Sequence, residues 1–247
     1  MKILVCISKT PDTTTRIVFN AAGKELDTNG VQFIMNPYDE WYALVRAIEI
    51  QEARGGTVTL VNVGDESNDS ILRKGLAIGA TDAIRVNANP GSALFVARQI
   101  AALARRDGYD LIFLGKETID FNGSEVGPMV AELLDLPFVS HANKFEWLDD
   151  TTALIQREIE GGVETLEVGL PLVLSAAKGM AEQRIPNMRG IMMAKSKPLQ
   201  VVEPVAAEER LEVVQFELPA GKSAVKMIGA DQMDELVRLL HEEAKVI

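Results

Sequence analysis

Apolar residues in the first half of the chain follow two alternating patterns. Short apolar runs occupy residues 3–7, 57–63, 83–86 and 111–114. Between them, residues 42–50, 71–78 and 93–106 carry apolar side chains at helical spacing. Apolar runs of this length that alternate with amphipathic helices are typical of parallel strands covered on both faces. The pattern predicts an α/β domain with a doubly wound, mostly parallel sheet.

The pattern changes after Pro137, where strand-like runs follow one another without helices. These runs lie at residues 138–147, 153–159, 165–168 and 172–174. Asp149-Asp150 and Gly161-Gly162 fit turn positions between them. We expect an antiparallel extension of the same sheet. Residues 176–204 then show little periodicity, and a long irregular segment of this kind is usually functional.

A last amphipathic pattern covers Asp231–Ala244, with Asp231 as the expected N-cap. We therefore divide the chain into two parts. Residues 1–204 form the α/β domain, including its antiparallel extension. Residues 205–247 form a C-terminal arm whose helix packs on its own domain or on another subunit.

Net charge limits the choice of partners. The chain carries a formal net charge of −11 over 247 residues, with a sequence pI of about 4.8. Nucleic acid is excluded as the main partner, because neutralising its phosphates requires a basic surface. No segment approaches 18 uninterrupted apolar residues, so membrane insertion is not expected. Residues 2–7 fit a first strand better than a signal peptide.

Cysteine and histidine are scarce. The single cysteine, Cys6, excludes an internal disulfide and fits a reducing compartment, which favours a cytoplasmic location. With two histidines there is no plausible zinc site. His141 and His241 have no nucleophile at motif spacing, so a catalytic triad is not expected. The sequence predicts a protein that is not an enzyme in its own right.

The best candidate site follows the apolar run Leu111–Leu114. The run stops at Gly115, a polar loop containing Gly123 follows, and a helical pattern then begins. A parallel strand that leads through a loop to a helix N-terminus offers free backbone N–H groups to an anion. We expect a phosphate-bearing ligand here, although Glu117 and Asp120 bring negative charge into the same loop.

Three further loops belong to the same predicted sheet edge: residues 8–15, 36–39 and 64–68. Each also fits a plain turn into the next element. In the second loop, Pro37 fixes the turn, Asp39 fits a helix N-cap, and Tyr38 is left where it could touch a ring system. The sequence contains no dinucleotide-binding G-x-G-x-x-G and no P-loop, so dispersed loops must hold any nucleotide.

Residues 184–193 combine large apolar side chains with arginine and glycine. Exposed methionine is frequent at adaptable protein-binding surfaces, which favours a docking role, and the alternative is a buried irregular loop.

Glu158 and Glu160 share one face of a strand, where carboxylates are usually solvated. Cys6 fits a small core residue.

Taken together, these segments resemble the β (small) subunit of electron transfer flavoproteins, over about residues 2–204. The resemblance rests on six motifs in order: Lys9–Asp12, Met35–Tyr38, Leu76–Ala80, Gly115–Asp120, Arg157–Gly162 and Arg189–Lys195. It implies a Rossmann-like nucleotide-binding domain within a heterodimer. The larger α subunit carries most of the FAD site, and the β subunit binds AMP, or a second FAD in electron-bifurcating members.

The resemblance also assigns the nucleotide contacts. These are expected at Cys6, Asn36, Pro37, Tyr38, Asp39, Val63, Gly115, Asp120, Asn122, Gly123, Ser124, Glu125 and Val126. Tyr38 and Thr13 are expected to approach the flavin of the α subunit. The run Asp120–Val126 matches neither the motif common in bifurcating members nor the acidic run of many AMP-binding members, so both alternatives stay open.

The implied mechanism is electron transport through protein docking. Flavin dehydrogenases are expected to bind the loop 184–193, with Met188 as its apolar anchor, and a mobile flavin domain passes electrons to a quinone-linked or other acceptor. The partner-binding residues are expected to be Arg184, Ile185, Pro186, Met188, Arg189, Ile191 and Met192. Glu158 is expected to pair with the α subunit.

Two other readings remain. A nucleotide sensor of the universal-stress type has a similar core, but such sensors end with the core and lack the antiparallel segment. A nucleotide-activating hydrolase needs phosphate-binding and acid–base groups that the sequence does not offer.

Overall fold

The computed structural model of the chain describes residues 1–221 and 224–247. These residues form two compact units, Met1–Gln215 and Phe216–Ile247. The expected division near residue 204, with a partner-binding role for the arm, stays a prediction.

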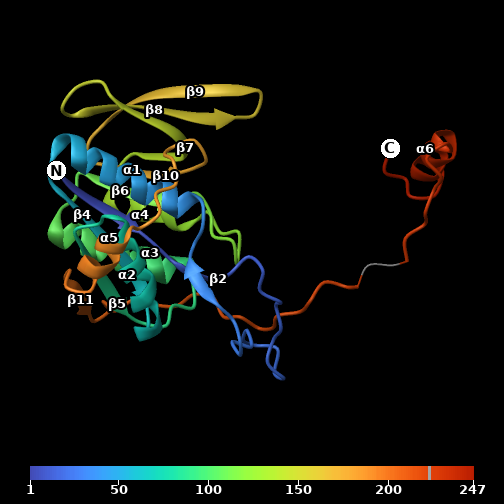
Figure 1. Ribbon diagram of the computed structural model, residues 1–247, viewed down its shortest axis with the longest axis horizontal. Coiled ribbons are helices and arrows are strands. Elements are labelled where there is room, and N and C mark those ends of the chain that lie inside the picture. Colours follow the sequence, from blue (N-terminus) through green and yellow to red (C-terminus); the bar gives the residue numbers. More distant parts are fainter. Residues whose placement is uncertain (222–223) are drawn as a thin grey trace. The chain divides into compact units, whose positions relative to one another are not determined.

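A nine-stranded sheet forms the centre of the first unit (Figure 1). The strand order is β11-β5-β4-β1-β6-β10-β7-β8-β9. All neighbours from β11 to β7 pair in parallel, and β7-β8 and β8-β9 pair antiparallel. The strands are β1 (Lys2–Cys6), β4 (Thr57–Gly64), β5 (Asp82–Asn87), β6 (Leu111–Gly115), β7 (Phe138–Trp147), β8 (Thr152–Ile159), β9 (Gly162–Gly169), β10 (Leu172–Ala176) and β11 (Leu199–Val202). The expected doubly wound fold with an antiparallel extension is confirmed.

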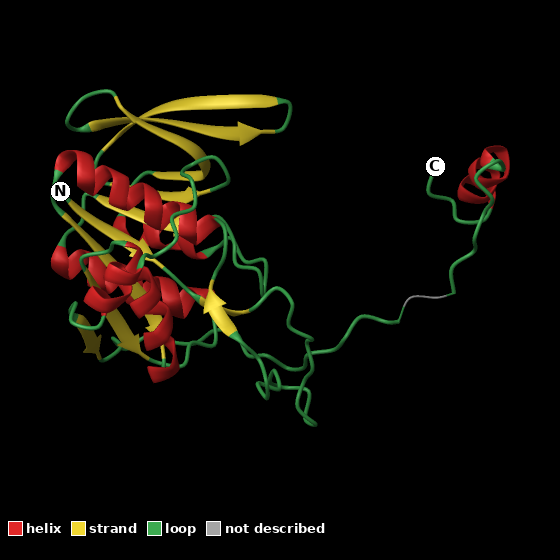
Figure 2. Ribbon diagram, in the orientation of Figure 1, coloured by secondary structure: helices red, strands yellow, loops and turns green. Residues whose placement is uncertain are grey.

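Helices cover the parallel strands on both faces (Figure 2). One buried cluster joins odd-numbered β1 residues such as Ile3 and Val5 to α1 (Asp39–Arg54) and α2 (Asp69–Ile78). The other joins Leu4 and Cys6 to α3 (Ala93–Asp107) and α4 (Val126–Leu134). Successive strand residues point to opposite faces, so one continuous apolar run serves both cores.

One strand differs from expectation in its pairing. The run at Leu172–Leu174 was expected within the antiparallel extension, but β10 lies between β6 and β7 and pairs with both in parallel. All five residues of β10 are buried, as in an interior parallel strand, whereas only Val139, Ala142 and Phe145 are buried among the ten residues of β7. An uninterrupted apolar run therefore distinguishes an interior parallel strand from an antiparallel one better than the lack of a helix before the strand does.

Short elements occupy regions that the sequence left irregular. A two-stranded antiparallel sheet joins β2 (Lys9–Pro11) to β3 (Phe33–Met35). A 3₁₀ turn, η1 (Glu66–Asn68), precedes α2. The helix α5 (Met188–Ala194) lies within the segment that showed little periodicity, and seven residues are too few for such a pattern to be clear.

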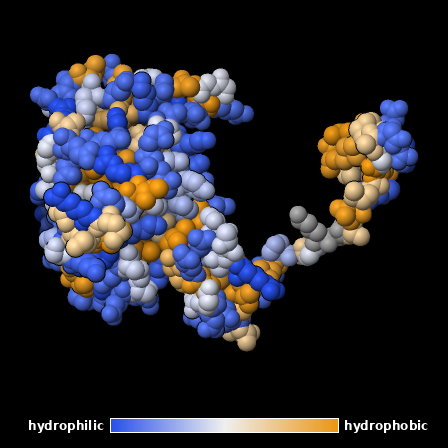
Figure 3. All heavy atoms as spheres, viewed as in Figure 1, coloured by the Kyte–Doolittle hydropathy of each residue, from blue (hydrophilic) through white to orange (hydrophobic). Residues whose placement is uncertain are grey.

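The second unit contains the helix α6 (Met233–Glu242). Apolar and polar side chains gather on opposite sides of this helix (Figure 3). Its N-cap is Gln232, and Asp231 lies one residue earlier, so the expected cap at Asp231 is wrong. A turn in which the Gln232 N–H donates to the Gly229 carbonyl (3.0 Å) precedes the helix and delays its start. Across the described ranges, none of the helices combines the length and apolar character required to span a bilayer.

Candidate functional site

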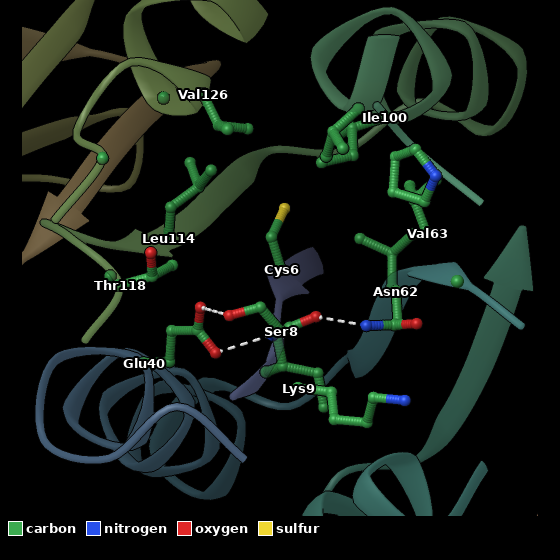
Figure 4. Close-up of a pocket in the computed structure, with 18 of the residues that line it drawn as sticks. Cys6, Ser8, Lys9, Glu40, Asn62, Val63, Ile100, Leu114, Thr118 and Val126 are labelled. Atoms are coloured by element: carbon green, nitrogen blue, oxygen red, sulfur yellow. Dashed lines mark hydrogen bonds between the residues drawn. The ribbon is translucent and has the colours of Figure 1, made fainter. Parts of the chain in front are cut away.

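The sheet order reverses direction between β1 and β6. From β1 the chain proceeds through β4 to β5, and α3 then crosses to β6 on the other side of β1. Ligands of open α/β sheets bind at such a reversal, outside the carboxyl ends of the strands. A cavity of about 320 Å³ lies at this position (Figure 4).

The floor of the cavity is apolar. Figure 4 shows Cys6 surrounded by Val63, Ile100, Leu114 and Val126, which come from β4, α3, β6 and α4. Burial, followed by the nearby Glu40 charge, raises the pKa of the Cys6 thiol. The thiol therefore stays neutral and acts as a small apolar contact, which suits the face of a flat ring.

Ser8 and Glu40 form a polar wall. The Ser8 N–H donates to Glu40 Oε2 (2.7 Å), and the Ser8 hydroxyl bonds Glu40 Oε1 (2.5 Å). Glu40 is 5% exposed. Burial, opposed by the Ser8 hydrogen bonds and reinforced by Asp120 and Asp39, raises the pKa of Glu40 to about 8. At neutral pH this carboxyl is therefore mostly protonated.

A second polar wall joins the ends of β1 and β4. The Asn62 amide donates to the Ile7 carbonyl (2.9 Å), and the Asn68 amide donates to Asn62 Oδ1 (2.8 Å). Both asparagines are buried and line the cavity. Their hydrogen bonds hold the turn at the start of α2 against the sheet, which places Asn68 in the cavity wall.

Asn36 positions the loop that follows β6. Its amide nitrogen donates to the Glu117 carbonyl (3.0 Å), and its amide oxygen accepts from the Ile119 N–H (3.0 Å). Asn36 is fully buried and does not line the cavity. In this structure it acts on the site through the loop backbone.

The residues next to Asn36 depart from the expected local geometry. Asp39 was expected as the N-cap of α1, but it is the first helical residue, and Tyr38 is the N-cap with a φ of 64°. Tyr38 is 61% exposed. Burial raises the pKa of Asp39 to about 6; the Lys116 charge lowers this pKa and the Glu117 charge raises it, both to a smaller extent. The positive φ turns the chain sharply after Pro37 and leaves the Tyr38 ring on the surface.

The expected nucleotide contacts divide into two groups. The first group lines the cavity: Cys6, Val63, Gly115, Gly123, Ser124 and Val126. The second group lies outside the cavity lining: Thr13, Asn36, Pro37, Tyr38, Asp39, Asp120, Asn122 and Glu125. Thr13, Asp120, Asn122 and Glu125 are exposed. All of these contacts stay predictions.

Several lining residues were not among the predicted contacts. They include Glu40, Asn62, Ile100 and Leu114, and also Ser8, Lys9 and Asn68 from loops that the sequence placed at this edge without assigning them a contact. One signal was available, because Asn62 interrupts the apolar run Thr57–Val63, and a polar residue inside a buried strand needs a partner. Glu40 gave no such signal, because an acidic residue in the first turn of a helix is ordinary.

A second candidate surface is the docking segment, which we define as residues 184–197. Its first end is fixed by the Trp41 indole, which donates to the Arg184 carbonyl (3.1 Å), and by a two-bond ion pair between Arg184 and Glu52 (2.7 and 3.1 Å). Its second end is fixed by Arg73, whose guanidinium donates to the carbonyls of Ala194 and Lys197 (both 2.7 Å). The backbone is therefore anchored on α1 and α2.

The side chains of the docking segment point outward. Ile185, Met188 and Met192 are 80%, 74% and 69% exposed. Arg189 and Ile191 are also exposed, and Pro186 is half-buried. The alternative of a buried irregular loop therefore does not hold. An apolar surface on a fixed backbone is suited to a protein partner.

Glu158 lies near the end of β8 and is exposed. Its carboxylate accepts a hydrogen bond of 3.4 Å from the Asn143 amide. An exposed carboxylate with this single long hydrogen bond can pair with another chain at small cost.

Comparison with known proteins agrees with this architecture. Residues 24–207, about three quarters of the chain, match the electron transfer flavoprotein domain. The chain belongs to the electron transfer flavoprotein family. The matched region contains the cavity loops from Asn36 onward and the whole docking segment.

Curated relatives identify the subunit type. The chain is 36% identical to electron transfer flavoprotein subunit beta of Bacillus subtilis (strain 168), with full coverage of both proteins. It is 31% identical to the Homo sapiens protein of the same name, covering all of this chain and 99% of that one. It is also 35% identical to the protein FixA of Azotobacter vinelandii, over 84% of this chain and 76% of the relative. The chain is thus a member of the electron transfer flavoprotein β-subunit family, as its sequence motifs predicted.

Proposed function

We propose that the chain is the β subunit of a heterodimeric electron transfer flavoprotein. In this role it carries no substrate chemistry of its own. The heterodimer accepts electrons from flavin dehydrogenases and passes them to a quinone-linked or other acceptor. The support for this proposal is full-length similarity to β subunits together with a cavity at the reversal of the sheet.

We further propose that this cavity holds AMP. The apolar floor around Cys6 suits an adenine ring, and the N-terminal turn of α4, whose Val126 and Gly127 line the cavity, suits a phosphate. Lys9 and Lys116 line the same cavity and supply positive charge. The nucleotide supplies structural cohesion, whereas the redox-active FAD is held mainly by the α subunit.

The docking segment is the proposed binding site for dehydrogenases. Met188 has the exposure that an apolar anchor requires, and the fixed backbone lowers the entropy that would be lost on binding. Tyr38 and Thr13 are exposed and available to the α subunit. Glu158 is the proposed partner of a basic group on that subunit.

The nucleotide content of the complex tests this proposal. The chain is co-expressed with its candidate α subunit, the purified complex is denatured, and released FAD and AMP are quantified per heterodimer. One FAD and one AMP are expected. Two FAD and no AMP would indicate an electron-bifurcating complex, for which NADH oxidation is then assayed. Absence of both flavin and partner would overturn the electron-transfer role.

A further inference from the structure

Glu40 is a buried acid at the point where the proposed nucleotide must bind. Both oxygens of its carboxyl face Ser8 (Figure 4), and in the described part of the chain no ion pair reaches it. Its methylene group also closes on β6, because a Cβ at Gly115 would lie 2.8 Å from Glu40 Cγ. The acid is therefore held in place on two sides and is compensated by hydrogen bonds alone.

The charges around Glu40 come from four elements. Its own helix contributes Asp39, the loop after β6 contributes Lys116, Glu117 and Asp120, β2 contributes Lys9, and the turn after β4 contributes Asp65. Lys116 is paired with Glu117 (3.3 Å), and the Lys9 ammonium donates to the Ser67 hydroxyl. The two cations are therefore partly engaged elsewhere, and acids outnumber them.

We infer that at alkaline pH a phosphate-bearing nucleotide enters this cavity together with a proton, which Glu40 takes up from solvent. This inference rests on the proposed function, because it requires a nucleotide in the cavity. A phosphate dianion beside a buried carboxylate is strongly unfavourable, and protonation of the carboxyl removes that repulsion.

The Ser8 pair accommodates the proton without rearrangement. With Glu40 neutral, the acid O–H donates to Ser8 Oγ, and the Ser8 N–H still donates to the other carboxyl oxygen. A hydroxyl can act as donor or acceptor, so the distances of 2.5 and 2.7 Å suit both protonation states. The site thus keeps one geometry while it exchanges one proton.

The pKa of Glu40 sets the pH range of the effect. In the nucleotide-free chain burial raises this pKa to about 8, and a bound phosphate raises it further. Below pH 8 the Glu40 carboxyl already carries its proton, so nucleotide binding takes up few protons. Above pH 8 each bound nucleotide takes up about one proton, and its Kd rises up to about tenfold per pH unit. The phosphate of AMP takes up no proton in this pH range, because the second pKa of a phosphate monoester is about 6.

The test uses the heterodimer after removal of its nucleotide, with AMP as the probe. Equilibrium dialysis gives the Kd between pH 7 and pH 9.5. Calorimetry at pH 9 in two buffers of different ionisation enthalpy counts the protons taken up. Glu40→Gln keeps a hydrogen-bonding amide in place of the acid. The control is Glu66→Gln, which removes an exposed carboxylate from η1, near but outside the cavity lining.

We expect about one proton per AMP at pH 9 for the parent and for Glu66→Gln, and none for Glu40→Gln. Equal pH slopes for the parent and Glu40→Gln would overturn the inference while leaving the nucleotide site intact. If Glu40→Gln does not assemble, the parent decides alone, because zero proton uptake at pH 9 contradicts the inference. Absence of AMP binding at every pH would instead overturn the proposed nucleotide site, and the inference with it.

Discussion

The cavity and the docking segment use the same scaffold in opposite ways. At the cavity, polar side chains turn inward and are satisfied by hydrogen bonds: Glu40 bonds Ser8, and Asn62 bonds the Ile7 carbonyl and Asn68. In the docking segment, the backbone is anchored and the apolar side chains turn outward. One site therefore hides its polar groups, and the other exposes its apolar groups.

The contrast shows what each kind of ligand requires. A small nucleotide is held by enclosure, so its site must satisfy every buried polar group before the ligand arrives. A protein partner is held by a few apolar side chains on a rigid support, so its site must resist collapse onto its own core. Changes to the cavity are therefore expected to alter stability and nucleotide content, and changes to the docking segment are expected to alter partner coupling.

The largest expected effect is the pH dependence that Glu40 gives to the free energy of unfolding. The pKa of Glu40 is about 8 in the folded chain and 4.5 in the unfolded reference. Between these values the unfolded chain releases a proton that the folded chain retains, so the free energy of unfolding falls as pH rises from 4.5 to 8. One pKa unit corresponds to 1.36 kcal/mol, which sets an upper bound of about 5 kcal/mol.

Urea denaturation of the nucleotide-free chain at pH 5 and pH 9 measures this loss. Glu40→Gln should remove most of it and be the more stable protein at pH 9. A loss of the same size in Glu40→Gln would show that other groups cause it.

The next effect comes from narrowing the cavity. In Gly115→Ala, the new Cβ meets Glu40 Cγ at 2.8 Å and the Glu40 backbone nitrogen at 3.0 Å. We expect a destabilisation of about 1–3 kcal/mol and loss of bound nucleotide. Gly169→Ala is the matched control, because its Cβ would meet no atom within 4 Å. Thermal unfolding and nucleotide quantitation distinguish the two, and full nucleotide content in Gly115→Ala would contradict the proposed site.

A smaller effect is expected where the docking segment is anchored. Arg73→Met leaves the carbonyls of Ala194 and Lys197 without their donor, at a cost of about 1–2 kcal/mol. Hydrogen exchange should quicken in residues 188–197 and stay unchanged around the cavity. The exposed Arg210 provides the control Arg210→Gln. Faster exchange spread over the whole first unit would mean that Arg73 supports the core instead.

Met188→Ala tests the proposed contact between the docking segment and its dehydrogenase partner. Because Met188 is 74% exposed, the Tm should not change, whereas coupling to a dehydrogenase should weaken by about 1–2 kcal/mol. Leu148→Ala removes a comparable exposed side chain far along the sequence and should change neither. Stopped-flow reduction of the heterodimer by the dehydrogenase measures the coupling. Unchanged rates in Met188→Ala would remove this residue from the docking role.

The sequence predicted the fold well because the fold depends on apolar periodicity. Each parallel strand is an apolar run, and each covering helix has one apolar side. Prediction was wrong where pairing depends on distant chain segments. Leu172–Leu174 reads as a strand, but only its burial between β6 and β7 makes it parallel.

The cavity was predicted less completely than the fold. Loops that end apolar strands could be found in the sequence, and the family resemblance added Cys6, Val63 and Gly123, which all line the cavity. Glu40 could not be found in this way, because its role depends on burial against Ser8 and Gly115, which lie far from it in the sequence. Asn36 was expected as a nucleotide contact, but its support of the loop could not be predicted, because its two hydrogen bonds span more than 80 residues of sequence.

The smallest expected effect on stability is at Glu158, on the antiparallel extension. Its carboxylate is exposed and accepts one long hydrogen bond, so Glu158→Gln should leave the Tm unchanged. If Glu158 pairs with the α subunit, the substitution removes the charge that attracts its partner, and the electron-transfer rate of the heterodimer should become less sensitive to salt. Glu160→Gln removes an exposed charge two residues away and should keep the salt dependence of the parent. Identical salt profiles for both variants would leave the extension with a structural role only, and the contrast between enclosed and exposed sites would then rest on the docking segment alone.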